Sequence, residues 1–276
     1  MSPYSPAFGD SAIMLRRNFK HTVRNPVTLF NAVLFPVIMM LMFVYVFGGA
    51  FKVQGRYVDY AVPGLLVMAI AYGLGPTAAA VNDDMTKGVI NRFKTMDVSR
   101  GAVLTGHVVA TTVRGLIADA VILVVGFAMG FRPHAGFLDW LAAIGVLLLL
   151  GFSVSWFTVA SGLAAKSVES ASFATVPLIM LPFLSSAFVP ADTMGTGVRQ
   201  FAEYQPFTPI IETLRALLSG GHPSIGDAWA AVAWCVGFAI FGYLWGVVGM
   251  VLAVPLVTMN SSSPGSSSRN TTLPCS

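Results

Sequence analysis

The chain has 276 residues, of which 55% are hydrophobic and only 10% are charged, whereas a soluble domain typically carries about 25% charged residues. A soluble fold of this size could not bury so much apolar surface, so the composition excludes an ordinary soluble domain and indicates one membrane domain. The formal net charge is +4. Because the basic residues lie in short segments beside apolar runs, they indicate membrane orientation rather than binding to nucleic acid.

Residues 8–24 predict an amphipathic helix at the membrane surface. Their apolar side chains recur at steps of three and four residues, which places them on one helical face, and Pro26 is expected to end the helix. A basic amphipathic helix beside a membrane span is typical of an interfacial helix, although a solvated basic leader that only sets topology would show the same pattern. The apolar residues are Phe8, Ala12, Leu15, Phe19 and Val23, and the basic residues are Arg16, Arg17, Lys20 and Arg24.

Six apolar stretches follow, and each is close to the ~20 residues that a helix needs to cross the hydrocarbon layer. The predicted fold class is all-α: a polytopic integral membrane protein with six transmembrane helices preceded by an interfacial amphipathic helix. A short polar segment at 166–170 separates the fourth stretch from the fifth and indicates two helices joined by a tight turn. The stretches are residues 27–49, 61–82, 105–130, 137–164, 171–189 and 228–250.

The predicted organisation has three parts: the amphipathic helix at 1–26, a six-helix membrane domain at 27–257, and a tail at 258–276. Pro255 is expected to break the last apolar run, and the serine-rich tail has low complexity and is predicted to be disordered. With the N-terminus inside, ten basic residues lie on the cytoplasmic side and five outside. This excess predicts cytoplasmic N- and C-termini.

The segment 82–100, between the second and third stretches, predicts a short helix with a small apolar ridge. Val89, Phe93 and Met96 are spaced by four and three residues and share one face, while Arg92 lies off it. Such a ridge can dock into a groove on a cytosolic partner. A loop that only sets topology, with its apolar residues packed on the ends of the spans, explains the pattern equally well.

Two charged residues fall inside the third stretch. Asp119 lies about fourteen residues into it, and Arg114 lies five residues earlier. A charge at such depth costs about 2.5–3.5 kcal/mol on insertion scales and usually faces a partner or a water-filled space. One interpretation is a polar lining of a transport route or of an interface between two copies. In the other, Arg114 reaches back to the inner surface and Asp119 pairs with it or with a hydroxyl group.

The motifs of common enzyme sites are missing from the sequence. No Gly-x-x-x-x-Gly-Lys-Ser/Thr phosphate-binding loop is present, so the chain is not expected to hydrolyse ATP by itself. The four histidines are scattered and match no metal-ligand spacing, and no serine has a histidine or lysine placed to activate it. We therefore predict no catalytic residue, no metal and no cofactor in this chain.

Several motifs together resemble the ABC-2 type permeases, and within them the daunorubicin-resistance permease group. The central motif spans residues 83–114, and two others lie near the first stretch and before the last one. The resemblance covers roughly residues 8–245, and its motifs are specific to the family rather than to a substrate. The segments that carry it are Lys87-Gly-Val-Ile-Asn-Arg-Phe-Lys94, Val98-Ser-Arg-Gly-Ala-Val-Leu-Thr-Gly-His107, Arg24-Asn-Pro26, Phe35-Pro36, Phe47-Gly-Gly49, Phe188-Val-Pro190, Gln205-Pro-Phe-Thr-Pro209 and Leu214-Arg-Ala216.

The resemblance implies contacts with a separate ATPase subunit. The loop at 83–100 corresponds to a coupling helix that sits on the ATPase, and the helix at 8–24 corresponds to a connecting helix that contacts the same subunit. The turn at 165–170 resembles a second cytoplasmic contact. The implied coupling-loop residues are Lys87, Gly88, Val89, Ile90, Arg92, Phe93, Lys94, Met96 and Arg100, and the implied connecting-helix residues are Arg16, Arg17, Phe19, Lys20 and Arg24.

The segment at about 190–220 resembles the half-inserted outer hairpin that closes the exit in such permeases. Its site residues are Pro190, Pro206, Glu212 and Arg215. Independently of the resemblance, the three-residue spacing of Glu212 and Arg215 predicts an ion pair on one helical face.

The implied function is that of the permease subunit of an ATP-binding cassette exporter that moves an amphiphilic drug, polyketide or lipid out of the cytoplasm. The protein would be a multi-pass component of the bacterial cytoplasmic (inner) membrane with a cytoplasmic N-terminus. A separate ATPase subunit would bind and hydrolyse ATP with magnesium. A second permease copy, identical or related, would complete the path through the lipid bilayer.

Three alternatives remain open. An ion-gradient-driven secondary multidrug transporter would need a titratable relay inside the membrane, for which Asp119 is the one strong candidate. A membrane-embedded enzyme would need a polar constellation at a membrane edge, and none is visible in the sequence. A structural component without transport activity would explain the apolar helices but not the docking ridge.

Overall fold

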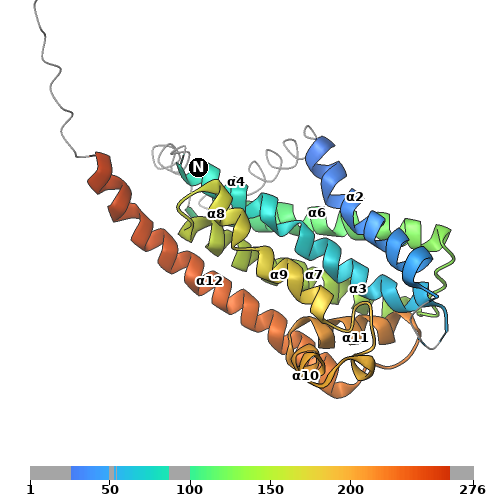
Figure 1. The fold of residues 1–276 in the computed structure, drawn as a ribbon. Coiled ribbons are helices and arrows are strands. Elements are labelled where there is room, and N and C mark those ends of the chain that lie inside the picture. Colours follow the sequence, from blue (N-terminus) through green and yellow to red (C-terminus); the bar gives the residue numbers. More distant parts are fainter. Residues whose placement is uncertain (1–25, 50–52, 54, 87–99, 262–276) are drawn as a thin grey trace, which may run out of the picture.

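The computed structural model describes residues 26–49, 53, 55–86 and 100–261, with side-chain detail for 34–49, 53, 55–86 and 104–246. Every regular element in this part of the chain is a helix, in agreement with the predicted all-α fold class. The helices form an elongated bundle in which successive passes run in opposite directions (Figure 1).

The elements are α2 (Pro26–Leu41), the π-helical η1 (Met42–Phe47), α3 (Tyr57–Tyr72), α4 (Leu74–Thr86), α6 (Arg100–Ala128), α7 (Phe137–Ala164), α8 (Val168–Phe173), α9 (Val176–Met180), the 3-10 helices η2 (Leu181–Leu184) and η3 (Ala191–Thr193), α10 (Thr196–Tyr204), α11 (Phe207–Leu218) and α12 (Ile225–Ser261). We call the end of the bundle that carries α8 the α8 end. The opposite end, which carries α10 and α11, is the α10 end (Figure 1).

Four helices in the described residues are long and apolar enough to cross a membrane, which supports the prediction of a polytopic membrane protein. They are Tyr57–Thr86, Leu104–Ala128, Phe137–Ala164 and Ile225–Gly246. Two shorter apolar helices, Leu34–Phe47 and Val168–Leu184, occupy the positions of the predicted first and fifth crossings. The count of six crossings stays a prediction, and the surface helix predicted at 8–24 lies outside the described residues.

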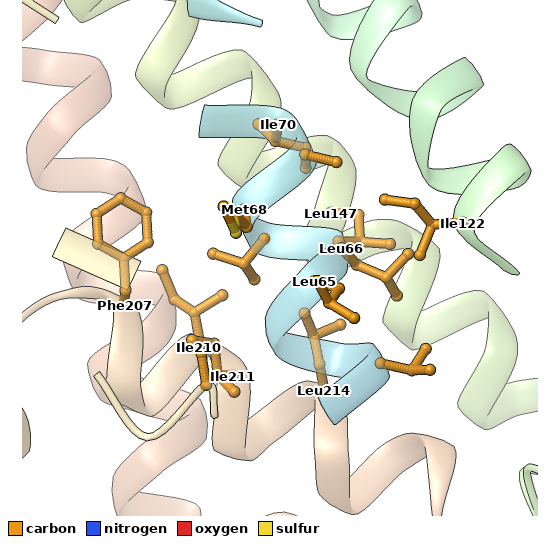
Figure 2. Close-up of a cluster of buried hydrophobic side chains, with 14 of the residues drawn as sticks. Leu65, Leu66, Met68, Ile70, Ile122, Leu147, Phe207, Ile210, Ile211 and Leu214 are labelled. Carbon is orange, nitrogen blue, oxygen red and sulfur yellow. The ribbon is translucent and has the colours of Figure 1, made fainter. Parts of the chain in front are cut away.

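The helix pair α3–α4 occupies the centre of the bundle. Of its apolar window, 72% is buried inside the protein, against 17% for α12. Leu65 and Leu66 on α3 are buried and belong to the same core cluster as Ile211 and Leu214 on α11, as Figure 2 shows. Because lipid is as apolar as this core, close van der Waals packing stabilises such contacts in a membrane protein. α11 is therefore an integral part of the bundle.

The fifth apolar stretch, predicted as one helix over 171–189, is divided into short helices. α9 and η2 each begin with a proline in their first turn, Pro177 and Pro182. Proline donates no backbone hydrogen bond and clashes with the preceding turn, so a regular helix stops before it. Irregular backbone at membrane depth is tolerated where protein covers it. Consistent with this, Thr175 is fully buried at the break, and its hydroxyl donates to the Ser172 carbonyl oxygen at 2.7 Å.

The predicted turn between the fourth and fifth stretches is confirmed. α7 covers 137–164, the same residues as the predicted fourth stretch, and α8 begins at Val168. The Ser167 hydroxyl accepts a hydrogen bond from the Ser170 backbone nitrogen at 3.2 Å. Such a bond satisfies one of the free N–H groups at the start of a helix and fixes the position where α8 begins.

Pro255 does not end the last helix, so that prediction was wrong. α12 continues through it to Ser261, and the first four residues of the predicted tail, 258–261, are helical. A proline inside a helix removes one hydrogen bond and distorts the turn before it. Every residue of a long helix other than the proline adds one backbone hydrogen bond. Membrane helices also tolerate proline more readily than soluble helices do.

A glycine brings α12 into backbone contact with α7. A Cβ atom on Gly242 would lie 2.5 Å from the backbone nitrogen of Phe157 and 2.6 Å from the carbonyl carbon of Trp156. Small residues at such positions let the backbones of two membrane helices approach closely. Beside this contact, the rings of Trp156 and Tyr243 pack edge to face with centroids 5.3 Å apart.

Replacing Gly242 with alanine should force α12 away from α7 and destabilise the protein by about 1–3 kcal/mol, since the atoms that would clash belong to the backbone. Thermal unfolding of the detergent-solubilised protein measures this change. Gly237→Ala on the same helix is the matched control, because a Cβ there meets nothing within 4 Å, and it should leave stability unchanged or slightly higher. Equal melting temperatures for the two variants would contradict the close helix contact.

Candidate functional site

Two of the predicted groups of site residues lie outside the described residues. They are the coupling-loop residues between 87 and 96 and the connecting-helix residues between 16 and 24, and their roles stay predictions. Arg100 is the first residue of α6, and its side chain is not described. The structure does describe the helices on both sides of the coupling loop, the intramembrane residues Arg114 and Asp119, and the outer segment.

At the α8 end, side-chain contacts fix the two helices that flank the coupling loop. Asn82 on α4 donates from Nδ2 to the carbonyl oxygens of Gly162 and Ala165 at 3.1 and 2.7 Å. Asp84 Oδ2 lies 3.1 Å from Nε2 of His107 on α6. The exposed fractions of the Asp84 and His107 side chains are 22% and 11%, so neighbouring protein largely shields the pair from solvent. α4 is therefore tied to α7 and to α6 immediately before the loop begins.

Arg114 extends a row of polar contacts from the α8 end into the bundle. Its Nη1 lies 3.5 Å from Thr77 Oγ1 on α4, which in turn lies 2.9 Å from Thr111 Oγ1. Thr111 donates to the His107 carbonyl oxygen at 2.8 Å. Because Thr111 precedes Arg114 by three residues on a helix that starts at the α8 end, the guanidinium extends in that direction.

Asp119 is buried in the core. The residue is 3% exposed, and its neighbours Ala118 and Ile122 on α6 belong to the hydrophobic core. Neither carboxyl oxygen has a hydrogen-bond partner among the described residues. The interpretation in which Asp119 pairs with Arg114 or with a hydroxyl group is therefore not what the structure shows. A buried polar group without a partner costs about 1–3 kcal/mol.

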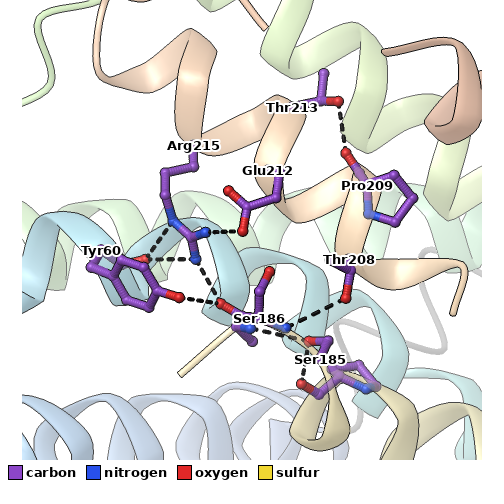
Figure 3. Close-up of polar contacts among 10 residues, drawn as sticks. Tyr60, Ser185, Ser186, Thr208, Pro209, Glu212, Thr213 and Arg215 are labelled. Carbon is purple, nitrogen blue, oxygen red and sulfur yellow. Dashed lines mark hydrogen bonds and ion pairs between the residues drawn. The ribbon is translucent and has the colours of Figure 1, made fainter. Parts of the chain in front are cut away.

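At the α10 end, Arg215 joins three segments of the chain (Figure 3). It pairs with Glu212 on the same helix, as their spacing predicts. Its Nη2 donates to the Ser186 carbonyl oxygen at 2.8 Å, and both Nε and Nη2 lie 3.3 Å from the Tyr60 carbonyl oxygen. The Tyr60 hydroxyl donates to the same Ser186 oxygen at 2.8 Å. The guanidinium carbon of Arg215 lies 3.8 Å from the centre of the Tyr60 ring, which adds a cation–π contact. Arg215 thus links α11 to α3 and to the segment after η2.

The segment after η2 packs against the start of α3. The Tyr57 hydroxyl donates to the Phe188 carbonyl oxygen at 3.0 Å, and the Phe188 ring stacks on Phe43 with centroids 4.0 Å apart. Gly64 makes the approach possible, because a Cβ there would lie 2.6 Å from Ala187 Cβ. The residues of this contact come from η1, α3 and the segment after η2, so the segment acts as a structural junction.

The predicted outer hairpin forms two unequal helices across the α10 end (Figure 1). Pro190 lies just before η3, and Pro206 lies just before α11. α10 is largely exposed and carries an ion pair between Arg199 and Glu203 at 2.7 Å, whereas α11 is largely buried. The predicted role of this hairpin in closing an exit stays a prediction.

Sequence reasoning missed most of the partners in these contacts. Tyr60 and Ser186 are 126 residues apart, Asn82 and Gly162 are 80 apart, and no local spacing connects such pairs. The available signal was a polar residue in or beside an apolar stretch, as for Asn82. Among the described residues, no three or more His, Cys, Asp or Glu side chains gather as a potential metal site.

The Arg215→Lys variant tests the three-way link. Lysine keeps the charge but lacks the planar fork that bonds several oxygens at once and stacks on a ring, so about 1.5–3 kcal/mol of stability should be lost. Thermal unfolding measures the loss, and hydrogen exchange should accelerate at 185–190. Arg199→Lys in the exposed pair on α10 is the control and should change neither quantity. A wild-type exchange rate in Arg215→Lys would refute the link.

The Asp119→Leu variant tests the unpartnered carboxyl. Removing a buried polar group that has no partner should raise the unfolding free energy by about 1–3 kcal/mol, seen as a higher melting temperature in detergent. Asp119→Asn keeps an unpartnered polar group of the same shape and should gain less. If both variants melt below the wild type, Asp119 has a stabilising partner that the described residues do not include.

Known proteins match this chain over the regions described above. A family model for the ABC-2 type transporter matches residues 11–219. The chain is 35% identical over 205 residues to the daunorubicin resistance ABC transporter permease protein DrrB1 of Streptomyces coeruleorubidus, covering 73% of this chain and 71% of that protein. It is 24% identical over 213 residues to the putative transport permease ycf38 of Cyanophora paradoxa, covering 75% and 73%. The protein of the same name from Porphyra purpurea is 22% identical over 228 residues, covering 80% and 78%.

The matched region extends over most of the chain and includes the central pair α3–α4, the polar contacts at the α8 end and the Arg215 link at the α10 end. Together with four helices that are apolar and long enough to cross a membrane, the match shows that the chain belongs to the ABC-2 type transporter family.

Proposed function

We propose that this permease is the membrane-spanning subunit of an ATP-driven exporter and that a separate ATPase subunit binds ATP with magnesium and hydrolyses it. The family match over residues 11–219 carries the proposal, because it places the chain among ABC transporter permeases. The sequence contains no phosphate-binding loop, which supports a separate ATPase subunit. No catalytic residue is assigned to this chain.

The α8 end faces the cytoplasm in this proposal. The coupling loop at 87–99, the turn at 165–167 and residues 1–25 all adjoin helix ends at the α8 end, and they carry most of the basic residues of the connecting segments. Cytoplasmic loops of membrane proteins carry such an excess of lysine and arginine. The N-terminus would then be cytoplasmic and the α10 end would face outward. We assign the protein to the bacterial cytoplasmic (inner) membrane, where ATP is available on one side only.

The contacts beside the coupling loop suit the transmission of force. Asn82, Asp84 and His107 connect α4 to α7 and to α6, so a push on the loop would move the ends of three helices together. α4 directly follows α3, with one residue, Gly73, between them. The movement would therefore be carried along the centre of the bundle to the α10 end. The apolar ridge with Phe93 would supply the surface that receives the push.

At the α10 end, Arg215 is the connection that such a movement would strain. It holds α11 and the Ser186 segment against Tyr60 on α3, so displacement of α3 would act directly on the outer hairpin. Pro190 and Pro206 mark the points at which this hairpin leaves and re-enters helical structure. These contacts support a role for the hairpin in opening and closing the outward side.

A second permease copy, identical or related, completes the path in this proposal, and the cargo is amphiphilic: a drug, a polyketide or a lipid. The name of the Streptomyces coeruleorubidus relative refers to daunorubicin resistance, which supports an organic cargo rather than a small ion. The low content of charged residues in the apolar helices supports the same class. The ion-gradient alternative depends on Asp119, whose carboxyl group has no hydrogen-bonded neighbour among the described residues to pass on a proton.

The test is co-purification of this chain with an ABC ATPase subunit from the same organism. We expect one detergent-stable complex whose ATP hydrolysis requires both chains. Phe93→Asp should dissociate the complex or uncouple hydrolysis, because it places a charge in the apolar ridge. Phe93→Leu keeps the ridge apolar and should behave as the wild type.

Failure to bind any ATPase, with transport unaffected by Phe93→Asp, would contradict the proposal at its mechanistic centre. Transport that survives depletion of ATP but collapses with the ion gradient would instead support the secondary transporter. Asp119→Asn then becomes the decisive variant, since that mechanism cannot operate without a titratable group at this depth.

A further inference from the structure

An open groove of about 410 Å³ lies at the α8 end, between the end of α7, the start of α8 and α12. Its walls are mostly apolar, and its polar groups lie toward the turn that joins α7 to α8. Among the described residues, none from the outer hairpin lines it. The residues that line it are Ser161, Ala164, Ala165, Lys166, Ser170, Ala174 and Trp245.

Lys166 gives the groove a positive charge without a competing anion. It lies in the turn between α7 and α8, is exposed, and forms no ion pair with any residue that the structure describes. The nearest acidic residue in the sequence, Glu169, is not part of the lining. Glu169 lies in the first turn of α8 and is exposed. The ammonium group is therefore available to an anion from outside.

The end of α7 places the groove relative to the membrane. The apolar crossing helix Phe137–Ala164 ends at the groove, so the groove lies near the headgroups. Trp245 on α12 lines it and stacks on Phe241 with ring centroids 5.7 Å apart. Tryptophan is enriched at the level of the lipid headgroups, where its ring is apolar and its N–H can reach water. The groove thus combines a charge in the headgroup region with an apolar wall that runs toward the bilayer centre.

We propose that this groove binds a phospholipid with an anionic headgroup. Lys166 and the Ser170 hydroxyl contact the phosphate, and an acyl chain lies along the alanine wall and the indole of Trp245. Basic sites between helices on the cytoplasmic side of membrane proteins bind such headgroups. The cytoplasmic placement rests on the orientation given under the proposed function, whereas the geometry and charge of the groove do not depend on it.

The surroundings of the groove favour lipid over a protein occupant. α12 forms one wall, and only 17% of its apolar window is buried. Phe241, Leu244 and Trp245 are all more than half exposed along this wall. A dock for a soluble partner would leave those apolar side chains beside a polar surface, whereas the acyl chains of a bound lipid cover them. The occupant is therefore amphiphilic and enters from the side of the bundle.

Quenching of Trp245 fluorescence by brominated lipid tests the proposal. The full chain is prepared with Trp140, Trp156, Trp229 and Trp234 replaced by phenylalanine and is reconstituted in phosphatidylcholine vesicles. Equal fractions of either brominated phosphatidylglycerol or brominated phosphatidylcholine are then added. We expect stronger quenching by the anionic lipid. Lys166→Gln should reduce this preference about five-fold, which corresponds to about 1 kcal/mol for one basic residue at a membrane surface, and Lys166→Arg should retain it.

Two controls make the test specific. Arg199→Gln removes an exposed basic residue at the α10 end and should leave the preference for phosphatidylglycerol unchanged. Inorganic phosphate added to the vesicles should not reduce quenching, because the free anion lacks the acyl chain. If the single-tryptophan chain does not fold, native mass spectrometry of the otherwise unaltered protein gives an equivalent measurement: bound phosphatidylglycerol should persist in the wild type and be lost in Lys166→Gln.

Equal quenching by the two brominated lipids would overturn the proposal and identify ordinary lipid around the protein. So would an unchanged preference in Lys166→Gln, or displacement by inorganic phosphate. Trp245 that is insensitive to both lipids but shielded when the ATPase subunit is added would assign the groove to protein docking instead. None of these measurements requires transport, so their failure would leave the exporter proposal standing.

Discussion

In a bilayer, a backbone carbonyl group without a partner finds no water to replace one, and two polar side chains of this protein bond backbone carbonyl groups at the two ends of the bundle. Arg215 bonds the carbonyl oxygens of Tyr60 and Ser186 at the α10 end. Asn82 bonds those of Gly162 and Ala165 at the α8 end. Both contacts secure α3–α4, the pair that the other helices surround. The apolar core between them then packs through close contact alone, aided by glycines that let backbones touch.

This arrangement gives the permease a central element that is fixed at both ends and buried between them. The coupling loop emerges from one of its ends, and the outer hairpin rests on the other. A protein that must convert a movement on one side of a membrane into a movement on the other needs such an element, because loosely packed helices would absorb the displacement. Asp119 is the exception within the packed interior. Its carboxyl group has no hydrogen-bond partner among the described residues, and ionisable residues inside a membrane usually mark functional sites.

α12, at the edge of the bundle, is packed differently from the central pair. α12 is held to α7 by the contact at Gly242 but turns most of its apolar surface outward. α12 therefore contacts lipid as well as protein. In the groove beside Lys166, the proposed lipid has an anionic headgroup. A lipid bound there would lie between α7, α8 and α12, close to the turn that the family resemblance relates to the ATPase.

The sequence by itself determined the all-helical membrane class, the family, the bounds of α7, the turn at 165–167 and the pairing of Glu212 with Arg215. These features depend on composition or on interactions among residues a few positions apart. The tertiary structure alone decided the other partners of Arg215, the pairing of Asp84 with His107 across 23 residues, the isolation of Asp119, and the division of the fifth stretch. It also showed that Pro255 lies inside a helix. The physical reason is that hydrophobic periodicity specifies which residues avoid water, but which buried polar groups meet is settled only when helices distant in the sequence pack side by side.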